Sequence, residues 1–226
     1  GVRSLNLGEI WHFFEEELRY PIDLIEASEI STVALESYNV IFLTEGYYSI
    51  GESTMEKIND WVSAGGRLVA IGSAINKLSG KDGFEIESKG TPEPDTSEKE
   101  PPVHHPEPYA GSDRRSMSDD IPGSIFQTTL DTTHPLCFGL GETYWTLKST
   151  TSNYQWLEEG GNAIYLDDSP RYYGFVGYRA LEKTKNTLIA GQEQIGGGSV
   201  VYFVDNPMFR SFWNSGKVLF SNALFF

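Results

Sequence analysis

The most regular hydrophobic pattern in the sequence runs from residue 54 to residue 71. Apolar residues first recur at the spacing of one helix face, at Met55, Ile58, Trp61 and Val62. Gly65 and Gly66 then offer the backbone freedom that commonly ends a helix, and residues 68–71 are all apolar, as in a strand buried on both faces. Together with an earlier apolar run at residues 40–43, which we interpret as a central strand, this pattern predicts a β-α-β unit.

Weaker periodicity predicts the remaining elements. Residues 9–19 are typical of a helix with Ile10, Trp11, Phe14 and Leu18 on one side, and residues 22–25 are typical of a short strand. Residues 213–226 are typical of a closing amphipathic helix with Ser211 as its N-cap. Short apolar segments, separated by Gly, Asn, Asp or Pro, predict strands at residues 125–130, 143–147, 163–166, 188–191 and 199–204.

These elements predict an α/β fold with a mainly parallel sheet, flanking helices and added antiparallel strands. The strands that end near Gly46, Ser73 and Asp205 are expected to lie side by side. At 226 residues the chain is long enough for one domain over residues 1–226. Within it, residues 90–110 combine six prolines with five acidic residues, which is typical of an extended surface loop.

The excess of acidic residues argues against some classes of binding partner. Acidic residues number 32 against 17 basic ones, which gives a net charge of -15. This excess disfavours nucleic acids and anionic membranes, which are bound mainly through clustered Lys and Arg. No apolar run approaches the ~20 residues that span a bilayer, so no membrane span is expected. No cofactor is expected either, because Gly196-Gly197-Gly198 lacks the strand-loop-helix setting of a phosphate-binding loop.

Three residues at predicted strand ends are the candidate catalytic or ligand-binding residues of the chain. Glu45, Ser73 and Asp205 each follow an apolar run, and in an open α/β sheet ligands bind beyond the carboxyl ends of the strands. We therefore expect a ligand crevice bordered by Gly46, Ser73, Asp205 and Asn206. A serine nucleophile needs a base such as His or Lys within hydrogen-bond reach. The sequence shows none for Ser73, so catalysis by Ser73 with Glu45 and Asp205 is an alternative interpretation.

The histidines and the cysteine are interpreted as structural. His104 and Glu107 have the H-x-x-E spacing of a zinc peptidase, but they lie among prolines and no third ligand for a catalytic zinc is apparent. We expect no metal there. His134, followed by Pro135, is expected to fix a loop by bonding to backbone. The single cysteine, Cys137, lies between Leu136 and Phe138 and is expected to pack in the interior.

Several segments together resemble one known domain. They are residues 8–14 (GEIWHFF), 40–43 (VIFL), 60–70 (DWVSAGGRLVA), 133–136 (THPL) and 198–210 (GSVVYFVDNPMFR). In these segments the chain resembles the C-terminal domain of secreted zinc carboxypeptidases from Bacteroidetes-type bacteria. That domain is similar to class I glutamine amidotransferases, and the likeness covers nearly the whole chain except the acidic loop.

The resemblance implies a flavodoxin-like sheet, whose first strand would precede Gly1, and an upstream peptidase domain that holds the zinc. Class I amidotransferases place a cysteine where this chain has Ser73, and His-Pro-Glu where it has Asp205-Asn206-Pro207. Gly46 would match the glycine of their oxyanion loop. Because both the thiolate and its base are replaced, amidotransferase activity is not expected.

The favoured hypothesis is a non-catalytic amidotransferase-like accessory or binding domain, with the upstream peptidase domain or its peptide substrate as partner. A secreted or periplasmic location is implied by the resemblance alone. Two alternatives stay open. One is a hydrolase or transferase that uses Ser73, and the other is a carbohydrate- or peptide-binding module. The second rests on aromatic residues in predicted loops and short strands: Tyr47, Tyr48, Tyr144, Trp145, Tyr154, Trp156, Tyr172 and Tyr173.

Overall fold

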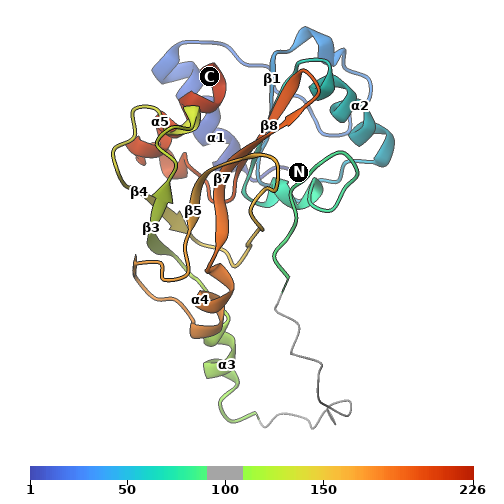
Figure 1. The fold of residues 1–226 in the computed structure, drawn as a ribbon. Coiled ribbons are helices and arrows are strands. Elements are labelled where there is room, and N and C mark those ends of the chain that lie inside the picture. The colour runs from blue at the N-terminus through green and yellow to red at the C-terminus, as the bar shows by residue number, and fades with distance from the viewer. Residues whose placement is uncertain (91–108) are drawn as a thin grey trace.

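A computed structural model describes residues 1–90 and 109–226 of the chain (Figure 1). One mixed sheet runs through them in the order β1-β2-β8-β7-β5-β3-β4, with β6 paired to β3. The strands are β1 (Val40–Leu43), β2 (Arg67–Ile71), β3 (Ser124–Leu130), β4 (Tyr144–Lys148), β5 (Gly161–Leu166), β6 (Tyr172–Tyr173), β7 (Thr187–Ile195) and β8 (Gly198–Phe203). The helices are α1 (Ser4–His12), α2 (Glu52–Ser63), α3 (Ser112–Ser118), α4 (Tyr178–Thr184) and α5 (Asn214–Phe225).

Three neighbouring strands form the parallel part of the sheet. β1 pairs with β2 and β2 pairs with β8, both in parallel. This confirms that the strands ending near Gly46, Ser73 and Asp205 lie side by side. In the described residues the other five pairings are antiparallel, so the sheet is mixed and only this part of it is parallel. β7 and β8 form a hairpin, in which Gly196 takes a positive φ of 59°.

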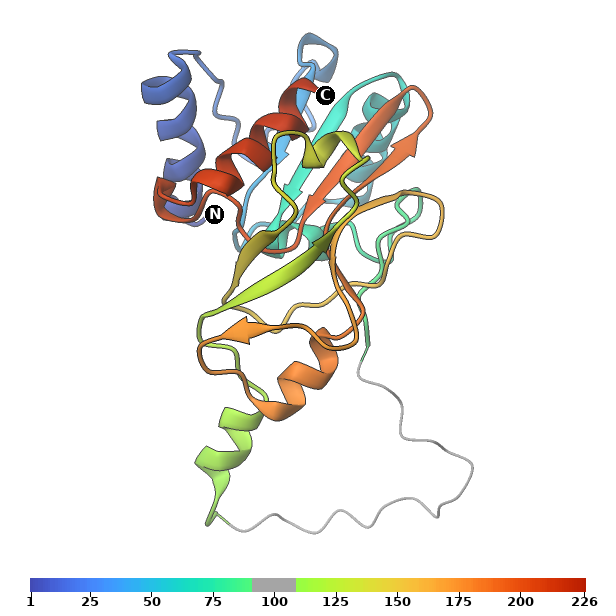
Figure 2. The ribbon, with the colours of Figure 1, turned by 60° about the vertical axis from the view of Figure 1, so that its left-hand side comes forward.

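Alternating side chains of the parallel strands enter two separate cores. Leu68 and Ala70 pack with the buried face of α2, whereas Val69 and Ile71 pack with residues of α1 and α5. The views in Figures 1 and 2 show α1 and α5 on one side of these strands and α2 on the other. This two-sided cover explains the continuous apolar run of β2. All four predicted α2 contacts are buried, which confirms that helix face.

Three predictions at the start of the chain are corrected by the structure. β1 stands at the end of the strand order rather than at its centre, and residues 22–25 form no strand. The first helix begins at Ser4 and continues as a π-helical turn over Phe13–Leu18. Of the predicted apolar face, Trp11 in α1 and Leu18 at the end of the π-helical turn are exposed, whereas Phe13 is buried. The π-helical turn changes the register of the residues that follow His12.

Later in the chain the predicted strands are found, but some other elements were missed. The five predicted strands correspond to β3, β4, β5, β7 and β8. The prediction of Ser211 as an N-cap is wrong, because Ser211 lies in a turn at φ 56° and α5 begins three residues later. The sequence pattern did not indicate α3, α4 or β6. Most of the acidic loop, including His104 and Glu107, lies outside the described residues.

Candidate functional site at the strand ends

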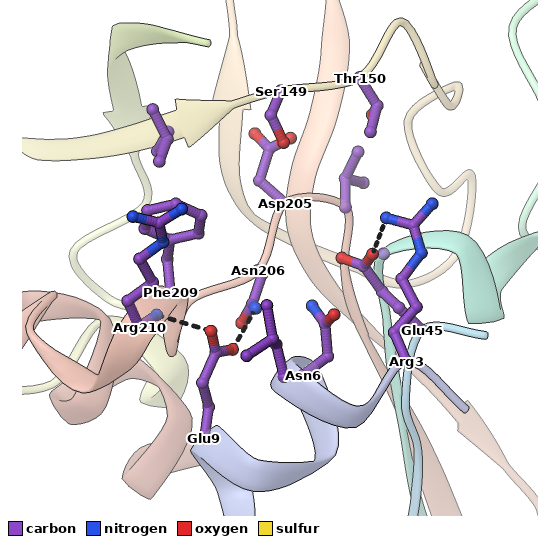
Figure 3. A pocket seen from close by; sticks show the side chains of 14 residues that line it. Arg3, Asn6, Glu9, Glu45, Ser149, Thr150, Asp205, Asn206, Phe209 and Arg210 are labelled. Carbon is purple, nitrogen blue, oxygen red and sulfur yellow. Dashed lines mark hydrogen bonds and ion pairs between the residues drawn. The ribbon is translucent and has the colours of Figure 1, made fainter. Parts of the chain in front are cut away.

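A polar cavity of about 190 Å³ lies beyond the carboxyl ends of the parallel strands (Figure 3). Charged groups from three distant parts of the chain line it: Arg3 and Glu9 near the N-terminus, Glu45 after β1, and Asp205 and Arg210 after β8. Amides and hydroxyls from Asn6, Ser149, Thr150 and Asn206 also line it, together with the apolar side chains of Leu5, Leu147, Val204 and Phe209. Asp205 and Asn206, two of the four residues predicted to border a ligand crevice, line this cavity. Gly46 and Ser73 are absent from its lining.

Glu9 holds the turn that follows β8. Its buried carboxylate accepts hydrogen bonds from Asn206 Nδ2 at 2.6 Å and from the Arg210 backbone N–H at 2.6 Å. Arg210 and Ser211 both have positive φ, 50° and 56°, a conformation that non-glycine residues rarely adopt. Backbone strain of this kind clusters at functional sites. The turn carries Arg210 to the cavity, as Figure 3 shows.

Asp205 is buried as an ion pair with Lys148. The Lys148 ammonium lies 3.6 Å from Asp205 Oδ1, and the Thr146 hydroxyl donates to Asp205 Oδ2 at 2.9 Å. Burial raises the pKa of Asp205, and Lys148 and Thr146 oppose that rise. The Lys148 ammonium also donates to Ser152 O at 2.8 Å. Lys148 is thus fully buried and committed to structural partners.

Glu45 faces Arg3 across the cavity wall. Its Oε2 atom lies 3.5 Å from Arg3 Nη1, and the pair is drawn in Figure 3. Burial raises the pKa of Glu45, Arg3 lowers it, and the nearby carboxylates of Glu9 and Asp205 raise it further. Three carboxylates therefore share this site, and each is held by a cation or by hydrogen-bond donors.

The sharp turn after β2 carries no side chain at its tightest position. Gly72, the first residue past the strand, has φ 56°. A β-carbon on Gly72 would lie 2.6 Å from Glu45 Cγ and would clash with the Glu45 carboxylate. The position where an α/β enzyme can present a nucleophile on a strained strand-to-helix turn is therefore occupied by a glycine, with Glu45 packed over it.

Ser73, the next residue, is engaged in a local hydrogen bond. Its hydroxyl accepts from the Gly46 N–H at 3.3 Å. Within residues 1–90 and 109–226, no His, Lys or carboxylate is hydrogen-bonded to Ser73. Gly46 itself packs against the N-terminal segment, through an isolated bridge to Val2. The residues expected to act as nucleophile and oxyanion-loop glycine thus bond to each other.

The structural roles expected for His134 and Cys137 are found. His134 Nδ1 accepts from Leu136 N at 3.1 Å, and burial lowers the pKa of the imidazole. Cys137 is buried against Ala163, and burial raises its pKa to about 11, so its thiol stays protonated at neutral pH. In the described part of the chain, no group of three His, Cys, Asp or Glu residues could hold a metal ion.

The predicted aromatic group divides between interior and surface. Tyr144 and Tyr154 are buried, so they are core residues rather than contact residues. Tyr47, Trp156 and Tyr173 are exposed.

Across the described residues, no helix is both long and apolar enough to cross a membrane.

The sequence could not point to the groups that hold the carboxylates. Glu9, Arg3 and Lys148 reach the site from α1, from the first residues and from the antiparallel strand β4. In the sequence, Glu9 is recognisable only as a Glu on the apolar face of a helix, and Lys148 only as a Lys at the end of a strand. Neither feature indicates which strand end the side chain contacts.

Comparison with known proteins supports the fold. No protein-family model and no curated protein matches the chain. A ThuA-like protein from Parabacteroides merdae matches with a TM-score of 0.55 and 13% identity, over 99% of this chain and 86% of its own. A ThuA-like protein from Bacteroides uniformis gives 0.54 and 12%, over 97% and 83%. These proteins have a class I glutamine amidotransferase-like fold.

A longer enzyme contains a similar domain. The β-galactosidase from Bacillus circulans sp. alkalophilus matches with a TM-score of 0.53 and 13% identity, over 96% of this chain. This chain covers only 26% of that enzyme, and 30% of an exo-β-1,4-mannosidase from an Opitutaceae bacterium. At these identities the likeness concerns the fold alone.

Proposed function

We propose that this chain is a non-catalytic amidotransferase-like domain whose strand-end cavity binds a small polar ligand. The observation that carries the proposal is the turn after β2, where Gly72 and the overlying Glu45 replace a nucleophile. In a flavodoxin-like fold, which the ThuA-like neighbours support, ligands bind beyond the carboxyl ends of the parallel strands. The parallel pairing of β1, β2 and β8 therefore supports a ligand site at this edge of the sheet.

The charges of the cavity favour a neutral or zwitterionic ligand. Glu45 is paired with Arg3, Asp205 with Lys148, and Glu9 with two hydrogen-bond donors. A cationic ligand would have to compete with Arg3 or Lys148 for these carboxylates, which is costly where the pair is buried. A strongly anionic ligand would lie beside the carboxylates of Glu9, Glu45 and Asp205. The exposed Arg210 side chain also lines the cavity and can pair with the carboxylate of a zwitterionic ligand. Asn6, Ser149 and Thr150 instead supply uncharged donors and acceptors. The volume of about 190 Å³ is below the ~300–1,000 Å³ typical of ligand pockets and suits a monosaccharide or a free amino acid.

The hydrolase alternative is less well supported by the geometry. Lys77 is on the same turn as Ser73, and burial lowers the pKa of its ammonium. However, Lys77 Nζ donates to Gly46 O at 3.3 Å and lies 4.3 Å from the centre of the Tyr48 ring. It is therefore not positioned to take the Ser73 proton.

We also propose, from the sequence resemblance, that the domain is an accessory to a secreted zinc carboxypeptidase-like protein. Its partner would be the peptidase domain or the peptide substrate. The sequence of the full-length gene tests this directly. An upstream H-x-x-E motif with a distant third His would support the accessory role, and a different upstream domain would contradict it.

The ligand proposal is tested by saturation-transfer NMR with monosaccharides and free L-amino acids as probes. At least one probe is expected to bind the wild-type chain and to be lost from Thr150→Trp, which fills the rim of the cavity. Thr132→Trp, at another exposed threonine, is the matched control and should retain binding. Equal binding to both variants, or to neither the variants nor the wild type, would contradict the cavity as the ligand site.

A further inference from the structure

A second groove lies far from the strand ends, between α3 and α4. Figures 1 and 2 show these two helices together at one end of the molecule, away from α1, α2 and α5. The groove has a volume of about 470 Å³. Its lining combines three arginines, Arg114, Arg115 and Arg179, with Met117, Phe175 and Tyr178. No carboxylate is among its described lining residues.

The floor of this groove is held rigidly by backbone contacts. The Gly177 N–H donates to Asp120 O at 2.9 Å. A β-carbon on Gly177 would clash with the carbonyl oxygens of Met117 and Ser118. The Ser124 hydroxyl fixes the neighbouring strand end by donating to Phe175 O at 2.6 Å. The close approach of α3 and α4 therefore depends on Gly177, and the groove between the two helices is preformed.

The walls of the groove carry large apolar side chains that face solvent. Met117 is 52% exposed, Phe175 47% and Tyr178 64%. Arginine, tyrosine, methionine and phenylalanine are the residue types enriched at protein interfaces. A single exposed aromatic residue is ordinary, but three large apolar side chains around one groove form a surface suited to an apolar anchor.

The positive charge of the groove is unusual for this chain. The Arg179 guanidinium lies 5.6 Å from the Tyr178 ring centre, and it shares Asp119 with Lys183, at 3.4 and 3.2 Å. Two cations on one carboxylate leave a surplus of positive charge beside Tyr178. Arg114 is exposed on α3. Asp113 lies in the first turn of α3 and Asp120 follows the helix, and neither lines the groove. On a chain of net charge -15, Arg114 and Arg179 form a local site for carboxylates.

From this combination we infer that the groove between α3 and α4 docks an acidic peptide segment of a partner protein. Its apolar side chain would pack among Met117, Phe175 and Tyr178, while flanking Asp or Glu residues pair with Arg114 and Arg179. This inference concerns a surface separate from the strand-end cavity, so it stands or falls independently of the proposed ligand.

The test is selection of a displayed random 12-residue peptide library on the intact chain. Enriched peptides are expected to carry at least two Asp or Glu residues near a Phe, Tyr, Trp, Leu or Met. In fluorescence anisotropy, the most enriched peptide should bind Arg114→Glu/Arg179→Ala at least tenfold more weakly than wild type. Arg19→Glu, at another exposed arginine, should change the affinity less than twofold.

A single variant and a change of salt concentration complete the test. Arg114→Glu alone alters an exposed side chain, so it should weaken binding even where the double variant fails to fold. Raising NaCl from 50 to 500 mM should also weaken binding, because ion pairs at a surface are screened. Failure to enrich any peptide, enrichment of basic or purely apolar peptides, or equal affinity for the Arg114→Glu and Arg19→Glu variants would overturn the inference. A single-stranded oligonucleotide that competes for the same arginines more strongly than the peptide would overturn it too.

Discussion

The buried pair of Lys148 and Asp205 connects the antiparallel part of the sheet to the parallel part. Lys148 ends β4, and Asp205 follows β8, yet their charged groups are 3.6 Å apart and almost entirely out of solvent. Desolvation makes such a pair a weak source of net stability, but removal of one partner leaves a buried charge alone.

Lys148→Met should therefore lower the free energy of unfolding strongly, by about 3–5 kcal/mol. Lys183→Met breaks the half-exposed pair with Asp119 and should cost at most about 1 kcal/mol. Both values are measured by urea denaturation at neutral pH. The double variant Lys148→Met/Asp205→Asn, which removes both charges, should be more stable than Lys148→Met alone. A single variant as stable as wild type would show that the buried pair is not formed.

At this scale the sequence predicted where polar groups stand but not which groups meet. Asp205, Asn206 and Glu45 were recognised because a polar residue directly after an apolar run marks a strand end. Their partners come from regions whose spatial position depends on the complete sheet order, and local periodicity does not determine that order. Ser73 was predicted to stand where a nucleophile would stand. In the structure Gly72, one residue earlier, is the first residue past β2 and takes the positive φ, a detail that local periodicity does not determine.

Among the elements, the β7–β8 hairpin carries a buried acid that is separate from the cavity. Glu193 accepts hydrogen bonds from the Tyr202 hydroxyl at 2.7 Å and from the Glu85 N–H at 2.8 Å. Burial raises the pKa of Glu193 above its ordinary value of 4.5, although both hydrogen bonds lower it. The folded hairpin thus binds a proton more tightly than the unfolded chain does.

The raised pKa of Glu193 makes the free energy of unfolding depend on pH in a defined direction. The contribution of Glu193 is fully present below pH 4.5, and it is lost as pH rises from there through the raised folded pKa. Glu193→Gln should remove this contribution, so the free energy of unfolding of the variant should fall less steeply with rising pH. The measurement is urea denaturation at a series of pH values above 4.5. Glu182→Gln, at an exposed residue of α4, should keep the wild-type slope, and an equally steep slope for Glu193→Gln would contradict the assignment.

Elements with a strong local signal were predicted, and those defined by tertiary contacts were not. α2 and β2 have clear periodicity and glycines at their junction, and both were found within a few residues. Residues 22–25 are apolar enough for a strand but find no pairing partner. α3 and α4 have seven residues each, which is too short for a reliable helical period.

In the molecule as a whole, two candidate binding surfaces lie at separate places on one fold. The strand-end cavity has compensated charges, whereas the groove between α3 and α4 presents arginines and exposed apolar side chains. We propose a small neutral or zwitterionic ligand for the first and an acidic peptide for the second. This division underlies the proposal that the domain binds a ligand, because among the described residues no base is hydrogen-bonded to Ser73.

In the proposed domain Ser73 is not an activated nucleophile, and covalent labelling tests this without knowledge of a substrate. The chain is incubated with a fluorophosphonate at neutral pH, beside a serine esterase as positive control, and its intact mass is measured. We predict an unchanged mass under conditions that fully label the esterase, because Ser73 lacks a base that could take its proton. A one-to-one adduct that peptide mapping places on Ser73, and that Ser73→Ala abolishes, would contradict the account.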